Sequence, residues 1–263
     1  GIEQLRDAGV EVTDGICREQ AVSLNAGFFR FLRTSIPWVI LKWAQTIDGS
    51  LSCANGRWIS CEESRKDVHK LRNSVQAILT GINTVLDDDP LLTPRPSRDE
   101  TGDPLRVIAD SRCRIPLDSQ IVATAGRTPT IIVTTAEAVI DHEDKCKSLT
   151  RAGVEVFACG DGNGRCDLKR LLIELGKRNI QRLLLESGPE MLSSFLAEDL
   201  ADEAVIYIAP QIGPVSAARP INKHIKDTCS LRDTVVTQIG CDGKISGLLK
   251  GQTAMQMEQS VPT

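Results

Sequence analysis

The spacing of apolar and polar positions changes repeatedly along the chain and predicts an alternation of strands and helices. Short runs of consecutive apolar residues are typical of strands that are buried on both faces. Several of these runs are separated by longer stretches with apolar residues every three or four positions, which is the spacing of an amphipathic helix. We predict strands at residues 38–43, 75–80, 105–110, 130–135, 154–160, 182–187 and 203–210, and helices at 63–74, 167–179 and 189–200.

This order of elements predicts a three-layer α/β fold. Strands that alternate with helices form a mainly parallel central sheet with helices on both faces. Near the C-terminal end the pattern changes, because residues 233–240 and 244–250 are two strand-like segments on either side of the turn sequence CDGK. A hairpin of this kind adds antiparallel strands to one edge of the sheet.

The two ends of the chain differ from the part between them. The sequence LRDAGVEV at residues 5–12 is typical of a helix end, a glycine stop and a short strand, and residues 18–34 have helical spacing. We predict that residues 1–36 are an incomplete unit and that residues 37–249 form the main domain. Residues 250–263 lack any period, and we predict a flexible tail there.

Charge and composition exclude several classes of partner. The formal net charge of −4 gives no reason to expect nucleic acid or an anionic membrane as a partner. Charged residues or prolines interrupt every apolar run well before the roughly 20 residues of a membrane span. The nine cysteines include no CxxC pair, so we predict no metal site and reduced thiols in a cytoplasmic protein.

Two other motifs give no site. In GDGNGRCD at residues 160–167, Arg165 stands where a calcium loop needs an oxygen ligand, so we interpret the stretch as a loop that ends at a helix cap, Asp167. No G-x-G-x-x-G follows a strand, so a Rossmann dinucleotide site is not indicated. The three histidines have no obvious nucleophile partner, and we expect all of them at the surface: His69, His142 and His224.

Polar segments follow three of the predicted strands, at residues 44–60, 81–95 and 187–194. In open α/β sheets small molecules bind beyond the carboxyl ends of the strands, so these segments are the first candidates for a site. The last of them, SGPEMLSS, is a turn followed by a helix start, whose free N–H groups favour an anion such as a cofactor pyrophosphate. Glu186 ends an otherwise apolar strand, and a carboxylate there should face a cleft or a ligand.

Three segments together resemble the reductase (C-terminal) domain of the bifunctional riboflavin-biosynthesis deaminase/reductase RibD. They are LKWAQTIDGSLSCANGRWIS, RKDVHKLRNSVQAILTGINTVLDDDPLLTPR and LLLESGPEMLSSFLAEDLADEAVIYIAPQIG, in the order that the family pattern has. The resemblance covers roughly residues 36–249 and implies a dihydrofolate-reductase-like fold. Residues 1–36 resemble the end of the preceding deaminase domain, whose zinc-binding elements are absent here. The resemblance therefore implies a deaminase domain upstream in the native chain and a homodimer.

The same resemblance implies the activity and the site residues. NADPH would reduce 5-amino-6-(5-phosphoribosylamino)uracil to the ribitylamino compound. Lys42, Glu186 and Asp88 would be catalytic, with Lys42 moving a proton to the sugar oxygen and Glu186 holding the pyrimidine or the opened sugar. The residues expected to contact NADP are Ala44, Trp58, Thr84, Asp88, Ser111 and Gly188, and those expected to contact the substrate are Arg72, Leu92, Arg95 and Glu186.

The acidic run within NTVLDDDPLLTPR finds a partial explanation in this resemblance. Like charges this close repel one another unless donors receive them. We predict a loop fixed by Pro90, in which Asp88 belongs to the site while Asp87 and Asp89 cap or solvate the turn. For Arg72 and Arg95 we predict bidentate hydrogen bonds to the substrate phosphate, which suit arginine better than lysine.

One departure from the family pattern affects the substrate site. Gly56 stands where the family usually has a serine, so that hydroxyl contact is lost or is supplied by Ser52 or Ser60. The segment at residues 111–114 could place Arg112 or Arg114 near the phosphate that distinguishes NADPH from NADH. Two alternatives stay open: another reductase of this fold that acts on a different pterin or pyrimidine, and a non-catalytic domain that binds nucleotide without turnover.

Overall fold

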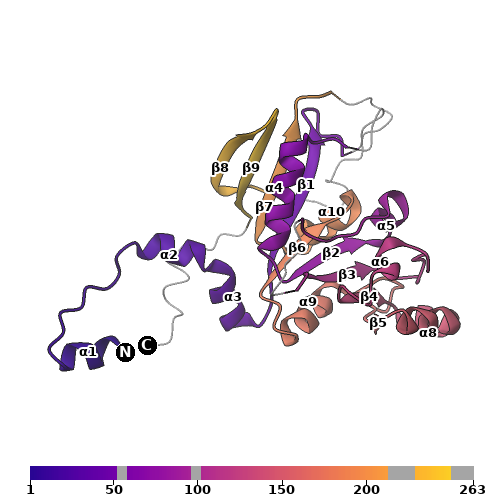
Figure 1. Ribbon diagram of the computed structural model, residues 1–263, viewed down its shortest axis with the longest axis horizontal. Coiled ribbons are helices and arrows are strands. Elements are labelled where there is room, and N and C mark those ends of the chain that lie inside the picture. Colours follow the sequence, from indigo (N-terminus) through magenta and orange to yellow (C-terminus); the bar gives the residue numbers. More distant parts are fainter. Residues whose placement is uncertain (52–57, 96–101, 213–228, 250–263) are drawn as a thin grey trace.

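The computed structural model describes residues 1–51, 58–95, 102–212 and 229–249. Its centre is a nine-stranded sheet with the strand order β5-β4-β3-β2-β6-β1-β7-β9-β8 (Figure 1). All pairs from β5 to β7 are parallel, and β9 and β8 continue the sheet in antiparallel orientation. The strands are β1 Trp38–Thr46, β2 Ala77–Gly81, β3 Leu105–Ala109, β4 Thr130–Thr134, β5 Val154–Ala158, β6 Arg182–Glu186, β7 Glu203–Ala209, β8 Arg232–Ile239 and β9 Asp242–Leu248.

Helices cover both faces of this sheet, which confirms the three-layer α/β prediction. The helices of the domain are α4 Glu62–Asn73, α5 Ile82–Asp88, α6 Gln120–Ala123, α7 Ala136–Asp141, α8 Glu143–Arg151, α9 Leu168–Lys177 and α10 Pro189–Ala197. One apolar cluster joins α4 to α8 with alternate strand residues such as Ile40 and Ile78. The other joins α9 and α10 with the intervening residues, such as Leu41 and Leu79. The central parallel strands have continuous apolar runs because both of their faces are buried in this way.

Local signals correctly predicted several boundaries. The side chain of Asp167 accepts a hydrogen bond from the backbone N–H of Arg170 at 2.9 Å, which confirms Asp167 as the cap of α9. The hairpin turn is at Gly240 and Cys241, not at residues 241–244, because Ile239 already pairs with Asp242. Gly240 has φ +58°, the left-handed conformation that a tight two-residue hairpin turn requires at its first position.

The N-terminal residues form three helices, α1 Ile2–Asp7, α2 Arg18–Leu24 and α3 Ala26–Thr34. The prediction of a short strand after Gly9 is wrong, because residues 10–15 have no regular secondary structure and pair with no described strand. The first two helices extend away from the sheet, whereas α3 packs beside β1 (Figure 1).

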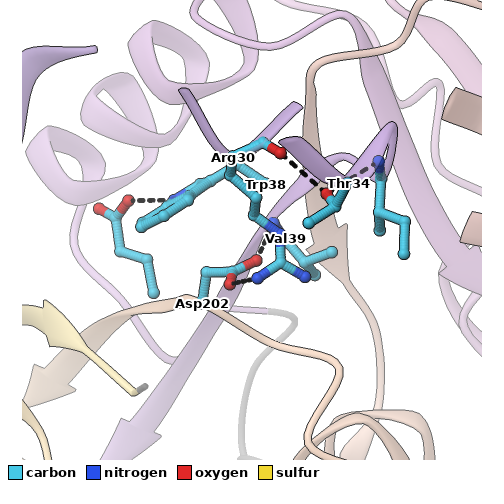
Figure 2. Close-up of polar contacts among 7 residues, drawn as sticks. Arg30, Thr34, Trp38, Val39 and Asp202 are labelled. Atoms are coloured by element: carbon cyan, nitrogen blue, oxygen red, sulfur yellow. Dashed lines mark hydrogen bonds and ion pairs between the residues drawn. The ribbon is translucent and has the colours of Figure 1, made fainter. Parts of the chain in front are cut away.

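A buried ion pair fixes α3 to the sheet, as Figure 2 shows. Arg30 donates to one carboxylate oxygen of Asp202, and the other oxygen accepts the backbone N–H of Val39 at 2.9 Å. Both charged side chains are at least nine-tenths buried. Contacts of the predicted incomplete unit, residues 1–36, thus reach into the core, and the boundary at residue 36 stays a prediction.

Two further expectations concern membrane-spanning helices and the C-terminal tail. Within the described residues no helix is long and apolar enough to cross a bilayer. The predicted flexible tail, residues 250–263, lies outside the described residues.

Candidate active site

A cleft of about 780 Å³ opens where β1 and β6 end and α4, α5 and α10 approach the sheet. This position, beyond the carboxyl ends of parallel strands, is the one that the fold class predicts for a small-molecule site. Its volume lies within the range of roughly 300–1,000 Å³ that is typical of ligand pockets. Of the eleven residues predicted for the site, ten line the cleft, and they are Lys42, Ala44, Trp58, Arg72, Thr84, Asp88, Leu92, Arg95, Glu186 and Gly188.

Lys42, Arg72 and Glu186 form a charged cluster in this cleft. The parallel register of β1 and β6 places Lys42 beside Glu186, and their charged atoms are 4.0 Å apart. Arg72 reaches over from α4 and donates to both oxygens of Glu186, at 2.6 and 3.0 Å. It also donates to the carbonyl oxygen of Thr93 at 3.0 Å. The N–H pair of Arg72 that we predicted for the substrate phosphate is therefore engaged by a protein carboxylate.

Burial and mutual attraction shift the ionisation of all three side chains. Each is less than one-fifth exposed. Burial lowers the pKa of Lys42, because the charge on Glu186 opposes this effect only in part and the charge on Arg72 adds to it. For Glu186 burial works the other way, but the charge and hydrogen bonds of Arg72, with help from Lys42, bring its pKa below the ordinary value. At neutral pH the cluster therefore contains an ionised carboxylate beside an amine that loses its proton more easily than usual.

The acidic run lies in a helix and not in the predicted loop. Helix α5 begins after Gly81 and includes Asp87 and Asp88 in its last turn, and Asp89 ends it with φ +40°. Asp89 accepts the backbone N–H of Gln120 at 2.9 Å, at the start of α6. Asp89 thus binds the start of the neighbouring helix α6, whereas we predicted that it caps or solvates its own turn. Asp88 is exposed and lines the cleft, so its role at the site stays a prediction.

Ser111 is the one predicted site residue that does not line the cleft. Its hydroxyl accepts the backbone N–H of Cys166 at 3.0 Å, which connects the end of β3 to the loop before α9. Arg114 donates to the side chain of Asn83 on α5 at 2.7 Å, and Arg112 is exposed. Ser60 lines the cleft, whereas Gly56 and Ser52 lie outside the described residues.

The expectation that His69 lies at the surface is wrong. It is partly buried and lines the cleft, and its Nδ1 has no hydrogen-bond partner among the described residues. Burial, together with the charges of Arg72 and Arg95, lowers its pKa. Of the other histidines, His142 is exposed, and His224 lies outside the described residues.

Comparison with known proteins agrees with this geometry. Residues 37–245 match the family model described as the RibD C-terminal domain. The chain belongs to this family. Among its curated relatives, the riboflavin biosynthesis protein RibD of Aquifex aeolicus is 41% identical over 81% of this chain and 57% of the relative. RibD of Actinobacillus pleuropneumoniae is 38% identical over 84% of this chain and 58% of the relative.

Solved structures of RibD proteins have the same architecture. RibD of Acinetobacter baumannii superposes with a TM-score of 0.77 at 31% identity, over 95% of this chain and 68% of that one. A Thermotoga maritima protein described as a diaminohydroxyphosphoribosylaminopyrimidine deaminase/5-amino-6-(5-phosphoribosylamino)uracil reductase has a TM-score of 0.75 at 26% identity, over 95% and 67%. These structures confirm the RibD fold predicted from the motifs. The chain spans somewhat more than half the length of the first two curated relatives.

Proposed function

We propose that this domain uses NADPH to reduce 5-amino-6-(5-phosphoribosylamino)uracil to 5-amino-6-(5-phosphoribitylamino)uracil. The observation that carries the proposal is the cluster of Lys42, Glu186 and Arg72 in a cleft large enough for a small-molecule ligand. The reaction opens a sugar ring, so it needs a proton donor for the ring oxygen, and Lys42 is a buried amine with a lowered pKa. Membership in the RibD C-terminal domain family supports the same reaction.

The start of α10 fits the pyrophosphate of a nicotinamide cofactor. Gly188 precedes the helix without any side-chain hydrogen bond that caps its N–H groups, and a Cβ atom at Gly188 would meet nothing within 4 Å. A helix start with open space at its cap residue favours a phosphate group. Ser187 accepts the backbone N–H of Gly81 at 3.0 Å and so holds the turn next to β2. When bound, NADPH supplies the hydride, and the protein residues orient the reactants.

The protein side chains have three further roles, which are proton donation, positioning of the donor and binding of the substrate phosphate. Lys42 Nζ donates the proton to the ring oxygen as that oxygen leaves the anomeric carbon. Glu186 holds Arg72 in place and keeps Lys42 close to it, which fixes the donor. Arg95 is exposed on the cleft and has no ion pair with any described residue, so we assign the substrate phosphate to it rather than to Arg72.

A kinetic experiment tests this function. NADPH oxidation is followed by the loss of nicotinamide absorbance, with the aminopyrimidine ribotide, with dihydrofolate and without a second substrate, and NADH is compared with NADPH. Oxidation only with the ribotide supports the proposal. Oxidation with dihydrofolate instead would favour another reductase of this fold, and cofactor binding without any oxidation would favour a non-catalytic nucleotide-binding domain.

A substitution separates the role of Lys42 from general damage. Lys42→Met should lower kcat by about 100-fold or more, because general acid catalysis contributes roughly 10²–10⁴. Lys66→Met is the matched control, since Lys66 is exposed and its one ion pair with a described residue is with Glu62 on the same helix. Equal kcat values for both variants would remove Lys42 from the mechanism.

The assembly is also part of the proposal. The curated relatives are longer than this chain, and the Thermotoga maritima protein is described as both deaminase and reductase. We infer that the domain works with a deaminase domain upstream in the native chain, in a cytoplasmic homodimer. Light scattering on the purified chain gives the mass that tests the homodimer.

A further inference from the structure

Two cysteines and an aspartate that are distant in the sequence meet outside the cleft. Cys61 stands directly before α4, and Cys241 and Asp242 lie at the turn between β8 and β9. Their two Sγ atoms and a carboxylate oxygen all lie within 4.8 Å of one another. The prediction of no metal site rested on the absence of CxxC pairs, and spacing along the chain does not reveal a cluster assembled in this way.

The local contacts hold these three side chains together. The backbone N–H of Cys61 donates to Asp242 Oδ2 at 2.8 Å, and the Cys241 thiol lies 3.6 Å from Oδ1. The Cys61 thiol in turn lies 3.3 Å from the carbonyl oxygen of Ile239. Gly240 packs directly on this group, because a Cβ atom there would come within 2.9 Å of Cys61 Sγ. The hairpin turn is therefore seated on the start of α4.

The cluster has an excess of electron-rich ligand atoms. Asp242 is only 1% exposed and has no ion pair with any described residue. A buried carboxylate normally has a cation or several donors around it. The carboxylate and the two sulfur atoms would all attract a positive ion.

We propose that Cys61, Cys241 and Asp242 bind one zinc ion. Thiolate sulfur and carboxylate oxygen are both zinc ligands, at about 2.3 and 2.0–2.2 Å, and a carboxylate makes the softer monovalent copper less suitable. Binding converts the two thiols to thiolates and releases two protons to solvent, while no group is oxidised or reduced. A water molecule completes the four ligands.

This ion fixes one wall of the cleft. Neither cysteine nor Asp242 lines the cleft, but Ser60, Arg65 and Trp58 on either side of Cys61 do. Arg65 donates to the carbonyl oxygen of Ser60 at 2.6 Å and lies 5.3 Å from the centre of the Trp58 ring. The ion joins this segment to the β8–β9 hairpin from behind and has no part in the reduction itself.

Cobalt titration of the whole 263-residue chain tests the site, independently of activity. The reduced, metal-free protein is titrated with Co²⁺, whose bonds to thiolates give intense near-ultraviolet absorption. We expect one cobalt ion per chain, displaced by one equivalent of Zn²⁺. Cys61→Ser or Cys241→Ser should weaken binding by at least about 100-fold. This is more than the loss of a residue that only hydrogen-bonds to a metal ligand would cause. Cys17→Ser is the matched control, because Cys17 is exposed and far from the cluster in the sequence, and it should bind as the parent does.

Thiol labelling in the unsubstituted chain gives a second measurement, which is unaffected by a variant that misfolds. Zn²⁺ should protect Cys61 and Cys241 from alkylation, while Cys17 stays reactive. The proposal is overturned if no thiolate absorption forms, if it persists in Cys241→Ser, or if both cysteines alkylate at the same rate with and without Zn²⁺. Recovery of the protein with a Cys61–Cys241 disulfide, formed in the presence of Zn²⁺ in place of metal binding, would overturn it as well.

Discussion

Replacing Glu186 with glutamine tests how far the charged cluster depends on its one carboxylate. The substitution keeps the shape of the side chain but removes the negative charge that lies between Arg72 and Lys42. Two cations then remain in a cleft where each side chain is less than one-fifth exposed. We expect a loss of stability, not only a loss of activity, because both cations were desolvated on folding.

The distances set the size of this effect. At an effective dielectric constant of about 20, unit charges 4 Å apart attract by about 4 kcal/mol, and Arg72 is closer to Glu186 than Lys42 is. The desolvation cost offsets part of this attraction, and removing one member of a buried pair typically costs about 3–5 kcal/mol. We therefore expect Glu186→Gln to lower the free energy of unfolding by about 3 kcal/mol at pH 7.

The loss should depend on pH in a defined direction. Lys42 has a lowered pKa in the folded protein, so above that pKa the unfolded chain binds more protons and stability rises with pH. Glu186 raises the pKa of Lys42, and its removal lowers that pKa further. Part of the lost stability should therefore return as the pH increases towards the ordinary value of lysine, 10.5, because Lys42 sheds its proton.

Urea unfolding of the parent and of Glu186→Gln, at pH 7 and at several higher pH values, measures both effects. Glu62→Gln is the control, since Glu62 is exposed and its pair with Lys66 should contribute nothing measurable. A loss below about 1 kcal/mol for Glu186→Gln at pH 7 would refute the reasoning, because it would mean that solvent already compensates the cluster.

Two further predictions concern an exposed and a buried arginine. Arg95→Ala should raise the KM for the phosphorylated substrate by about 10- to 100-fold and leave the KM for NADPH unchanged, because a hydrogen bond to a charged group contributes about 1.5–3 kcal/mol. Arg95→Lys should recover only part of the lost affinity. Equal effects on both KM values would contradict this role. Arg30→Met should lower the free energy of unfolding by about 3 kcal/mol, measured in urea, because Asp202 stays charged and buried. Adding Asp202→Asn should recover part of the loss, since the amide oxygen still accepts the Val39 N–H. A double variant less stable than Arg30→Met would refute this.

Most of the sheet could be predicted from the sequence because its strands are buried on both faces. Each of the nine strands overlaps a segment that we predicted as a strand, and the exposed strand β8 was indicated by the hairpin turn and not by an apolar run. The end of β1 was predicted too early, since Gln45 interrupts the apolar run although the strand continues to Thr46 beside β7. The strand order was not predicted, because β1 lies between β6 and β7 and pairing between distant strands leaves no local pattern.

Helices without a broad apolar face were harder to predict. Helix α8 buries only Cys146 and Leu149 among charged residues, and α5 contains the acidic run that we read as a loop. His69 was placed at the surface for the same reason, since its neighbours in α4 are charged. In each case contacts with other parts of the fold decide which few positions are buried, and the composition of the helix does not show them.

The site shows a deeper limit of sequence reasoning. Motifs indicate which charged residues converge at strand ends, and ten of the eleven predicted positions do line one cleft. They do not indicate which charges already compensate one another. Arg72 and Arg95 looked equivalent in the sequence, but Arg72 is held by Glu186 and Thr93 whereas Arg95 has no ion pair with a described residue. Because a charge that is already paired contributes little further attraction to a ligand, the two arginines should respond differently to the same substitution, and their measured KM values decide whether the pairing governs recognition.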